Sequence, residues 1–338
     1  MDNSWKLLQS LEAEPIAKHY LSRCYKNKGF SHPERLAFQQ SSRFSYLWRQ
    51  ARLFYLTAET ADLSVQPLLL FYGCAHLLKA MLITQEPSYP QNSKVLQHGV
   101  TTRKVKKSSY QLTEDEVRPQ KEGLFPLLAR SFALHPMQDR YLVHELFLSI
   151  APLSRIYASV TDTKPVWIPV AAAPFIRQDE EHNGSSWACL TFPETADGPL
   201  AYSPETLLQY IRRFSSSEPV LSEWQWRTGE SDKQLLLPQC ALSRLEQHPF
   251  FDREGDTLYF WNDPTDTPPL PAWASHYLLL YVLGMLCRYE TEWWGELTMS
   301  HGLAERYLVE RFLDYHVTAF PAALKMQIER STGVSILT

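Results

Sequence analysis

Three polar side chains recur on one face of an otherwise apolar segment, and their types suit the binding of an anion. Residues 67–83 are apolar around almost the whole circumference of a helix, which predicts a buried helix. At helical spacing, Tyr72, His76 and Lys79 fall within about 60° of one another. A buried lysine and histidine are costly unless they meet an anion, a carboxylate or a hydrogen-bond partner. We therefore expect this stripe to face a ligand or an internal acid.

A basic segment follows soon after this helix. His98 and Gly99 begin it, and the next cations come without an intervening acid. A glycine lets backbone N–H groups approach an anion closely, an arginine fork matches phosphate oxygens, and lysines add charge. The segment and the stripe together predict a phosphate-binding site, with plain surface charge or pairing with the acids at 114–116 as the alternative. The cations concerned are Arg103, Lys104, Lys106 and Lys107.

A second candidate group lies near the C-terminus of another apolar helix. Arg288 and Tyr289 end this run, followed closely by Trp294. An arginine and an aromatic ring suit a phosphorylated ligand, although a cation that ends a helix is also ordinary compensation of the helix dipole. We include Arg288 and Tyr289 among the predicted ligand-binding residues.

A third pair gives a catalytic alternative. Arg311 is followed five positions later by His316, a spacing that resembles the ribonuclease motif of HEPN (higher eukaryotes and prokaryotes nucleotide-binding) domains. In those domains the histidine performs acid–base work and the arginine stabilises the charged transition state without a metal. In a regular helix, residues five apart diverge by about 140°. The polar residue usual after the arginine is also missing here.

Other catalytic signatures are absent from the sequence. The histidines show no zinc spacing, and there is no phosphate loop, no dinucleotide fingerprint and no serine-hydrolase elbow. Cys74 lies two residues from His76, but such neighbours face different ways on a helix. We expect no metal, no cofactor and no complete catalytic set, which favours a non-enzymatic protein without excluding an enzyme.

Composition limits the class of protein. The 338 residues carry a net charge of −4, which argues against general binding of nucleic acid. Five scattered cysteines without a CxxC pair suit a reducing cytosol. The longest charge-free apolar run, 277–287, is shorter than the roughly 20 residues that cross a bilayer. We expect a cytoplasmic protein that does not enter membranes.

The order of the patterns predicts an α+β fold, mainly a helical bundle with a β-rich insertion in the middle of the chain. The strand patterns include 187–192, and also 221–227 paired as a hairpin with 234–237. Pro169 suggests an edge strand, a capping box at Thr113 predicts a helix start, and Pro321 predicts the opening of a last helix. The expected parts are N-terminal helices (1–160), the β-rich insertion (161–270), and C-terminal helices (271–338) that pack back on the first part.

The same segments carry a family resemblance. The apolar helix, the His98-Gly99 block with Arg103-Lys104, and the later Arg288-Tyr289-Glu290 block with its tryptophans are similar to the YaaC-like protein family. The likeness runs from about Phe44 to Ala322. It implies a cytoplasmic helical protein, distantly HEPN-like. It also gives weight to the family-block residues Lys79, His98, Gly99, Arg103, Lys104, Arg288 and Tyr289.

These patterns lead to one expected function and two alternatives. We expect a cytoplasmic regulator that binds a phosphorylated small molecule, a purine nucleotide or guanosine alarmone, and then acts on a partner protein such as a purine-biosynthetic enzyme. The first alternative is a HEPN-like ribonuclease of the toxin or defence type that uses Arg311 and His316. The second is a protein-interaction scaffold that exposes Trp224 and Trp226. A homo-oligomer is compatible with each of them.

Overall fold

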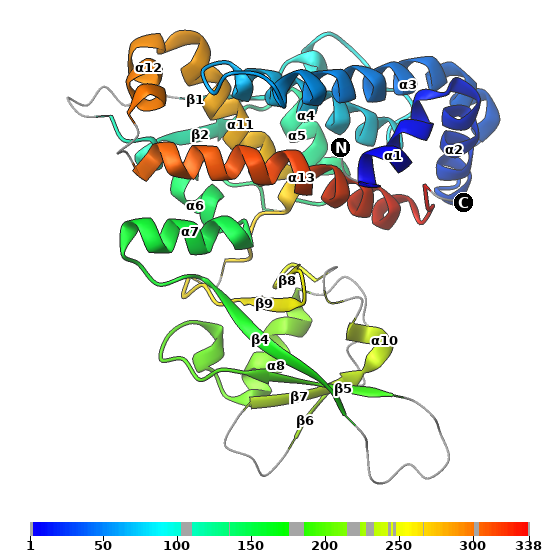
Figure 1. Cartoon of the computed structure of the whole chain (residues 1–338). Coiled ribbons are helices and arrows are strands. Elements are labelled where there is room, and N and C mark those ends of the chain that lie inside the picture. The colour runs from blue at the N-terminus through cyan, green and yellow to red at the C-terminus, as the bar shows by residue number, and fades with distance from the viewer. Residues whose placement is uncertain are drawn as a thin grey trace. The chain divides into compact units, whose positions relative to one another are not determined.

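The chain folds into two compact units, each with its own core (Figure 1). Unit 1 comprises Met1–Phe147 and Ala272–Thr338, and unit 2 comprises Leu148–Pro271. The computed structural model describes residues 3–102, 110–134, 136–175, 186–214, 224–227, 233–242, 245, 248–265, 267–300 and 304–336. The α+β class, helical with a β-rich insertion, is confirmed. The second unit begins at Leu148, so residues 148–160, expected in the N-terminal helical part, belong to it.

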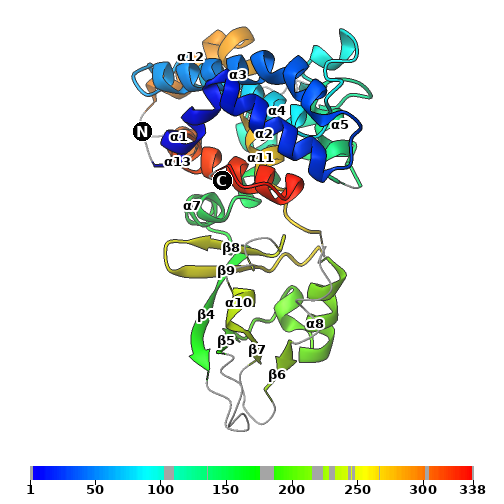
Figure 2. The ribbon, with the colours of Figure 1, turned by 90° about the vertical axis from the view of Figure 1, so that its right-hand side faces the viewer.

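Unit 1 is built from helices that both ends of the chain contribute. Figure 2 shows α2 and α3 lying side by side. Prolines occupy the first turns of α2, α3 and α4, where the missing N–H costs nothing. The described helices are α1 (Asn3–Leu8), α2 (Glu14–Asn27), α3 (Pro33–Ala58), α4 (Gln66–Ile83), α5 (Leu124–Ser131), α6 (Val143–Leu148), α11 (Ala272–Tyr289), α12 (Thr291–Met299) and α13 (Ala304–Thr332).

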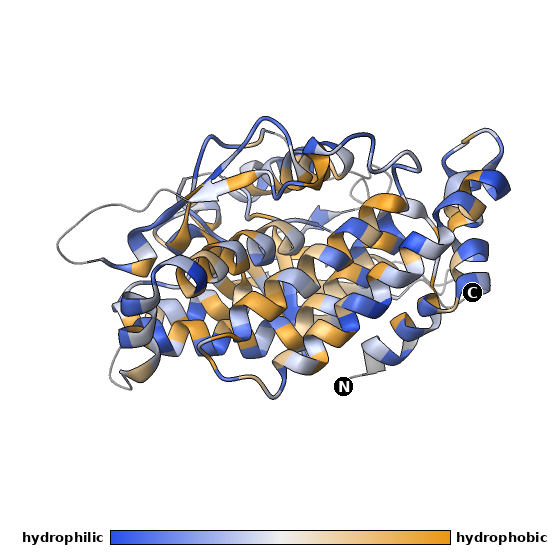
Figure 3. Ribbon diagram, turned by 90° about the horizontal axis from the view of Figure 1, so that it is seen from above, coloured by the Kyte–Doolittle hydropathy of each residue, from blue (hydrophilic) through white to orange (hydrophobic). Residues whose placement is uncertain are grey.

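Two apolar helices, α4 and α11, form the centre of unit 1. They pack against each other, and nearly all of their side chains are buried. Gly73 leaves room for the ring of Tyr55 on α3, because an added Cβ would lie 2.8 Å from that ring. Figure 3 shows hydrophobic residues concentrated on the helices in the middle and hydrophilic residues on the outer ones. By length and composition α4 could cross a membrane, but 67% of it is buried inside the protein, as in the core helix of a soluble protein.

A short sheet replaces the helix that the capping box at Thr113 predicts. Residues Leu112–Glu114 form one 3-10 turn, and β2 (Glu116–Pro119) follows, paired with β1 (Val100–Thr102) and β3 (Tyr141–Leu142). The Glu116 carboxylate does not cap a helix, because it forms an ion pair with Arg118 at 2.6 Å. The capping-box prediction is therefore wrong. The long loop expected before Tyr110 contains β1 and a 3-10 turn at Lys94–Leu96.

The C-terminal helix continues through Pro321, although a proline was expected to open a separate helix. Helix α13 contains Pro321 in its interior, and this residue is buried. A proline removes one backbone donor from a helix. Packing of the surrounding apolar side chains in unit 1 keeps the two halves in one helix.

Unit 2 is a six-stranded antiparallel sheet in the order β6-β7-β5-β4-β9-β8, with α8 and α10 packed against it (Figures 1 and 2). Of the hairpin predicted from 221–227 and 234–237, the described residues show β6 paired with β7, with Gln225 opposite Leu236, while residues 221–223 lie outside the described residues. The strands are β4 (Trp167–Phe175), β5 (Trp187–Phe192), β6 (Gln225–Trp226), β7 (Lys233–Pro238), β8 (Phe251–Glu254) and β9 (Thr257–Trp261); the helices are α7 (Ala151–Thr161), α8 (Pro204–Arg213) and α10 (Gln239–Leu242).

Two expectations about unit 2 need correction. Strand β4 lies inside the sheet, so Pro169 is not in an edge strand, but its half of β4 pairs with β9 alone. Trp224 is only 3% exposed and belongs to the core of the unit, while Trp226 is half-buried. Trp224 is therefore not part of an exposed aromatic docking surface.

Candidate anion-binding site

The polar stripe predicted on α4 is present and half-buried. Tyr72, His76 and Lys79 follow one another along this helix. The Nδ1 atom of His76 donates a hydrogen bond to the Tyr72 carbonyl oxygen at 2.6 Å, because a carbonyl only accepts. Burial, followed by the charge of Lys79, lowers the pKa of His76, so this ring is neutral near pH 7. Its Nε2 atom is then left as a hydrogen-bond acceptor.

Lys79 is the most informative member of the stripe. Burial lowers the pKa of its ammonium group, and no carboxylate contributes to the shift. Within the described part of the chain, Lys79 forms no ion pair and no hydrogen bond. A half-buried ammonium group without an acid costs stability in the folded protein.

His98 lies just before β1 and is held firmly through its backbone. Its carbonyl oxygen accepts from the Tyr277 hydroxyl at 3.0 Å and from the Phe125 amide at 3.1 Å. Its ring contacts Phe71, with 4.8 Å between centroids, and also Tyr281, at 5.9 Å. The Nδ1 atom is buried without a hydrogen-bond partner among the described residues. This imidazole therefore packs against aromatic rings and keeps one nitrogen without a hydrogen bond to the described residues.

The charge around His98 is positive on two sides. Burial, then Lys79, then Arg288 lower the pKa of His98 to about 4. Lys79 comes from α4 and Arg288 from the C-terminus of α11, so two helices bring cations toward one neutral imidazole. Arg288 donates to the Gly284 carbonyl at 3.1 Å, and none of the described carboxylates forms an ion pair with it. The charges of Lys79 and Arg288 thus both act on His98, and a role for these three residues in ligand binding stays a prediction.

Tyr289 stands next to this cluster and is largely exposed. The Arg288 guanidinium lies 5.1 Å from the centroid of its ring, in a cation–π contact. The ring is 66% exposed. An exposed tyrosine ring beside an arginine offers a flat surface on which a planar group can stack.

Gly99 lies where two backbone segments pack closely. Its φ is +75°, and an added Cβ would lie 3.0 Å from the backbone of Gly123 and 2.6 Å from Pro126. Close packing therefore requires glycine here, and its predicted approach to an anion stays a prediction. The predicted cations Arg103, Lys104, Lys106 and Lys107 lie outside the described residues.

A pocket that the sequence did not reveal lies at the C-terminus of α11. It has a volume of about 50 Å³, and its polar walls are Thr102, Asp115, Tyr289 and Glu290. Three apolar side chains of α11 form the rest. Glu290 follows Arg288 and Tyr289 directly in sequence, which is the one signal that could have drawn attention to it. Asp115 comes from a distant segment, and no spacing rule connects it with α11.

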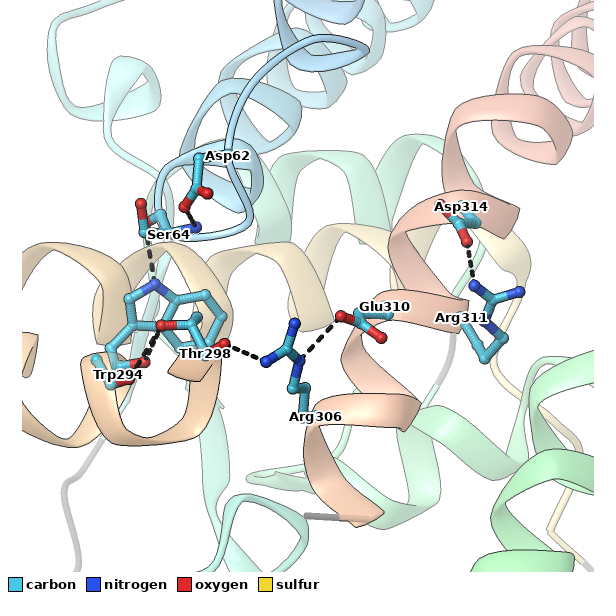
Figure 4. Close-up of polar contacts among 9 residues, drawn as sticks. Asp62, Ser64, Trp294, Thr298, Arg306, Glu310, Arg311 and Asp314 are labelled. Atoms are coloured by element: carbon cyan, nitrogen blue, oxygen red, sulfur yellow. Dashed lines mark hydrogen bonds and ion pairs between the residues drawn. The ribbon is translucent and has the colours of Figure 1, made fainter. Parts of the chain in front are cut away.

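The residues of the ribonuclease alternative do not meet. Arg311 is 44% exposed and pairs with Asp314 at 2.7 Å on the surface of α13 (Figure 4). His316 is fully buried and lies 2.6 Å from the Tyr55 hydroxyl. A residue with no exposed surface cannot contact RNA in this conformation. Figure 4 also shows Arg306 bonded to Thr298 and Glu310, so the neighbouring arginine of α13 is paired as well.

Comparison with known proteins identifies a family. The family model described as YaaC-like Protein matches residues 9–328, nearly the whole chain, so the chain belongs to the YaaC-like protein family. No curated protein and no solved structure matches the chain. The predicted family is therefore confirmed, and the link to HEPN domains finds no support in these comparisons.

Proposed function

We propose that this member of the YaaC-like family is a regulatory protein that binds a phosphorylated small molecule at Lys79 and Arg288. One observation carries the proposal: two cations from different helices both lower the pKa of His98, and no described carboxylate pairs with either. Half-buried cations without an acid destabilise the folded protein, so their presence indicates a role in binding. A bound phosphate group supplies a negative charge that can pair with both cations.

The donor set suits phosphate in particular. Arg288 offers a planar fork of N–H donors, and Lys79 offers a compact charge. A neutral His98 carries one N–H group and one lone pair, so it can donate to a phosphate oxygen. The aromatic surroundings of His98 lower the local dielectric constant, which strengthens attraction between the cations and a bound anion.

The exposed ring of Tyr289 favours a nucleotide over inorganic phosphate. A base can stack on this ring while its phosphates reach Arg288 and Lys79. A purine nucleotide or guanosine alarmone is the class of ligand that we propose. The described cluster contains no paired base and nucleophile, which favours regulation over catalysis. A cytoplasmic receptor of this kind would act on a partner protein, for which a purine-biosynthetic enzyme is a suitable target.

Calorimetry on the full chain tests this proposal. The titrants are inorganic phosphate, pyrophosphate, GDP, ADP and guanosine tetraphosphate, each at low and high salt. We expect at least one nucleotide to bind, with weaker binding at high salt because charge attraction is screened. The variants Lys79→Met and Arg288→Met should each weaken binding by about tenfold or more, equal to ~1.4 kcal/mol.

A matched control separates the site from general surface charge. Lys94 is exposed and pairs with Glu122 at 2.9 Å, so Lys94→Met should leave binding unchanged. Absence of binding to every phosphorylated compound would refute the proposal. Equal losses in Lys79→Met and Lys94→Met would refute it too, because the site would then be only diffuse charge.

A further inference from the structure

We infer that the pocket at the C-terminus of α11 receives the hydrogen-bond-donor edge of a guanine base, whose phosphates lie on Lys79 and Arg288. This inference rests on the proposed function and adds the identity of the base. It concerns Asp115 and Glu290, which the phosphate site itself does not use.

The walls of the pocket have distinct chemistry. The face of α11 that carries Val282, Met285 and Leu286 is apolar, as expected for residues three and four apart on one side of a helix. Asp115 and Glu290 are the acidic residues of the lining, and Tyr289, another lining residue, contacts the Arg288 guanidinium. The volume of about 50 Å³ holds a few water molecules. It therefore accepts the edge of a ring, while the body of the ring lies outside against Tyr289.

Carboxylates select donors because they are acceptors only. Asp115 is 3% exposed and accepts from the Glu116 amide at 2.7 Å and from the Tyr110 hydroxyl at 2.5 Å. Each of its oxygens keeps a further lone pair, so it can accept again. Burial is the main cause that raises the pKa of Tyr110, and the charges of Asp115 and Glu290 add to it, so both carboxylates lie near this hydroxyl.

Guanine is the purine whose hydrogen-bond donors match the carboxylates of the pocket. Its N1–H and its 2-amino group point the same way from one edge, so a carboxylate can accept from both. Adenine presents the lone pair of N1 at this edge, which a carboxylate repels, and hypoxanthine presents N1–H alone. A buried mismatch of this kind discriminates strongly, because unpaired polar groups are costly.

Arg288 joins the pocket to the phosphate site. One of its guanidinium nitrogens lies 3.1 Å from the sulfur of Met285, a pocket residue. The same guanidinium stacks on Tyr289, the second pocket residue that it touches. Its charge also acts on His98, as does the charge of Lys79. Arg288 thus contacts two residues of the pocket and acts on His98, which suits a ligand with a donor-rich base and an anionic tail.

Competitive calorimetry with GDP, IDP, ADP and pyrophosphate on the full chain tests the inference. We expect affinity to fall in the order GDP, IDP, ADP, with about tenfold or more between GDP and ADP. Glu290→Gln should weaken GDP by about tenfold and leave pyrophosphate unchanged, because pyrophosphate has no base. Glu292→Gln, in the exposed first turn of α12, is the matched control and should change nothing.

The possible results distinguish failure of the guanine inference from failure of the proposed function. Equal binding of GDP and ADP overturns the guanine inference, while the phosphate site stands. A guanine preference that is unchanged in both Glu290→Gln and Asp115→Asn also overturns it, because the carboxylates of the pocket would then not bind the base. Failure of all four compounds to bind overturns the guanine inference together with the proposed function.

Discussion

The Nδ1 atoms of His276 and His316 lie 2.8 Å apart in the core of unit 1. His276 comes from α11 and His316 from α13, and the Tyr55 hydroxyl of α3 lies 2.6 Å from the second nitrogen of His316. Two nitrogens at this distance share one proton, so one imidazole donates and the other accepts. The contact therefore requires at least one ring to be neutral, and it links three helices through one buried chain of hydrogen bonds.

The first prediction is that the protein loses stability at acid pH because of these two histidines. Burial lowers the pKa of His276 to about 3, and burial followed by the charge of His276 lowers that of His316 well below its usual value. A folded pKa below the unfolded value of about 6.5 means that the unfolded chain binds more protons, so stability is lost as pH falls below that value. From pH 7.5 to about 5, His276 alone should remove about 2 kcal/mol from the free energy of unfolding.

Urea unfolding across this pH range measures the effect. The variant His276→Leu should be less stable at pH 7.5 but should show a flatter pH profile. His19→Leu, at an exposed position on α2, should keep the slope of the wild type. A wild-type stability that stays constant between these pH values contradicts the prediction.

The second prediction isolates the Tyr55 hydroxyl. Tyr55→Phe removes one partner of His316 and leaves a buried nitrogen without a hydrogen bond, which costs about 1–3 kcal/mol. Tyr46 lies on the same helix with 65% of its surface exposed, so Tyr46→Phe is the matched control and should change stability by less than about 0.5 kcal/mol. Thermal unfolding of both variants provides the measurement; equal melting temperatures would show that the buried bond contributes nothing.

Periodicity in the sequence was sufficient to predict features that lie on one face of a single helix. The apolar circumference of α4 predicts its burial, and the spacing of Tyr72, His76 and Lys79 predicts their shared face. These are properties of a single element. The β6–β7 hairpin belongs to the same class, because its two strands are close in the chain.

Features that join distant segments could not be predicted in this way. Tyr55 and His316 are 261 positions apart, and a buried pair at that separation leaves no mark on local spacing. The capping box at Thr113 failed because Glu116 lies in β2, where it pairs with Arg118 of the same strand and with Arg140, which folding brings near. The carboxylate pocket is of the same kind, since Asp115 meets α11 through tertiary packing.

The third prediction tests the close backbone approach at Gly99. Gly99→Ala adds a Cβ at a positive φ and within 2.6 Å of Pro126, so we expect a loss of roughly 2 kcal/mol or more in unfolding free energy. Gly295, inside α12, has nothing within 4 Å of its Cβ position. Gly295→Ala should therefore stabilise by about 0.5–1 kcal/mol, through helix propensity alone. Denaturant unfolding compares the two, and a Gly99→Ala protein as stable as the wild type would contradict the packing argument.

The fourth prediction is that Lys79 opposes folding in the absence of ligand. Burial lowers the pKa of its ammonium group, so the charged form is disfavoured in the folded state. Lys79→Met keeps the length of the side chain without the charge, and it should raise the free energy of unfolding of the ligand-free protein by about 1 kcal/mol. Lys94→Met, at an exposed ion pair, should change it by less than about 0.5 kcal/mol.

The stability difference between Lys79→Met and the wild type should also depend on pH. A lysine with a lowered folded pKa destabilises below that pKa, and the penalty disappears as pH rises toward the unfolded value of about 10.5. The advantage of Lys79→Met over the wild type should therefore be largest near pH 7 and should shrink in alkali. Denaturant unfolding at both pH values measures it. A variant that is less stable than the wild type at pH 7 would show that Lys79 serves packing, whereas greater stability combined with lost nucleotide binding identifies a residue retained for its ligand.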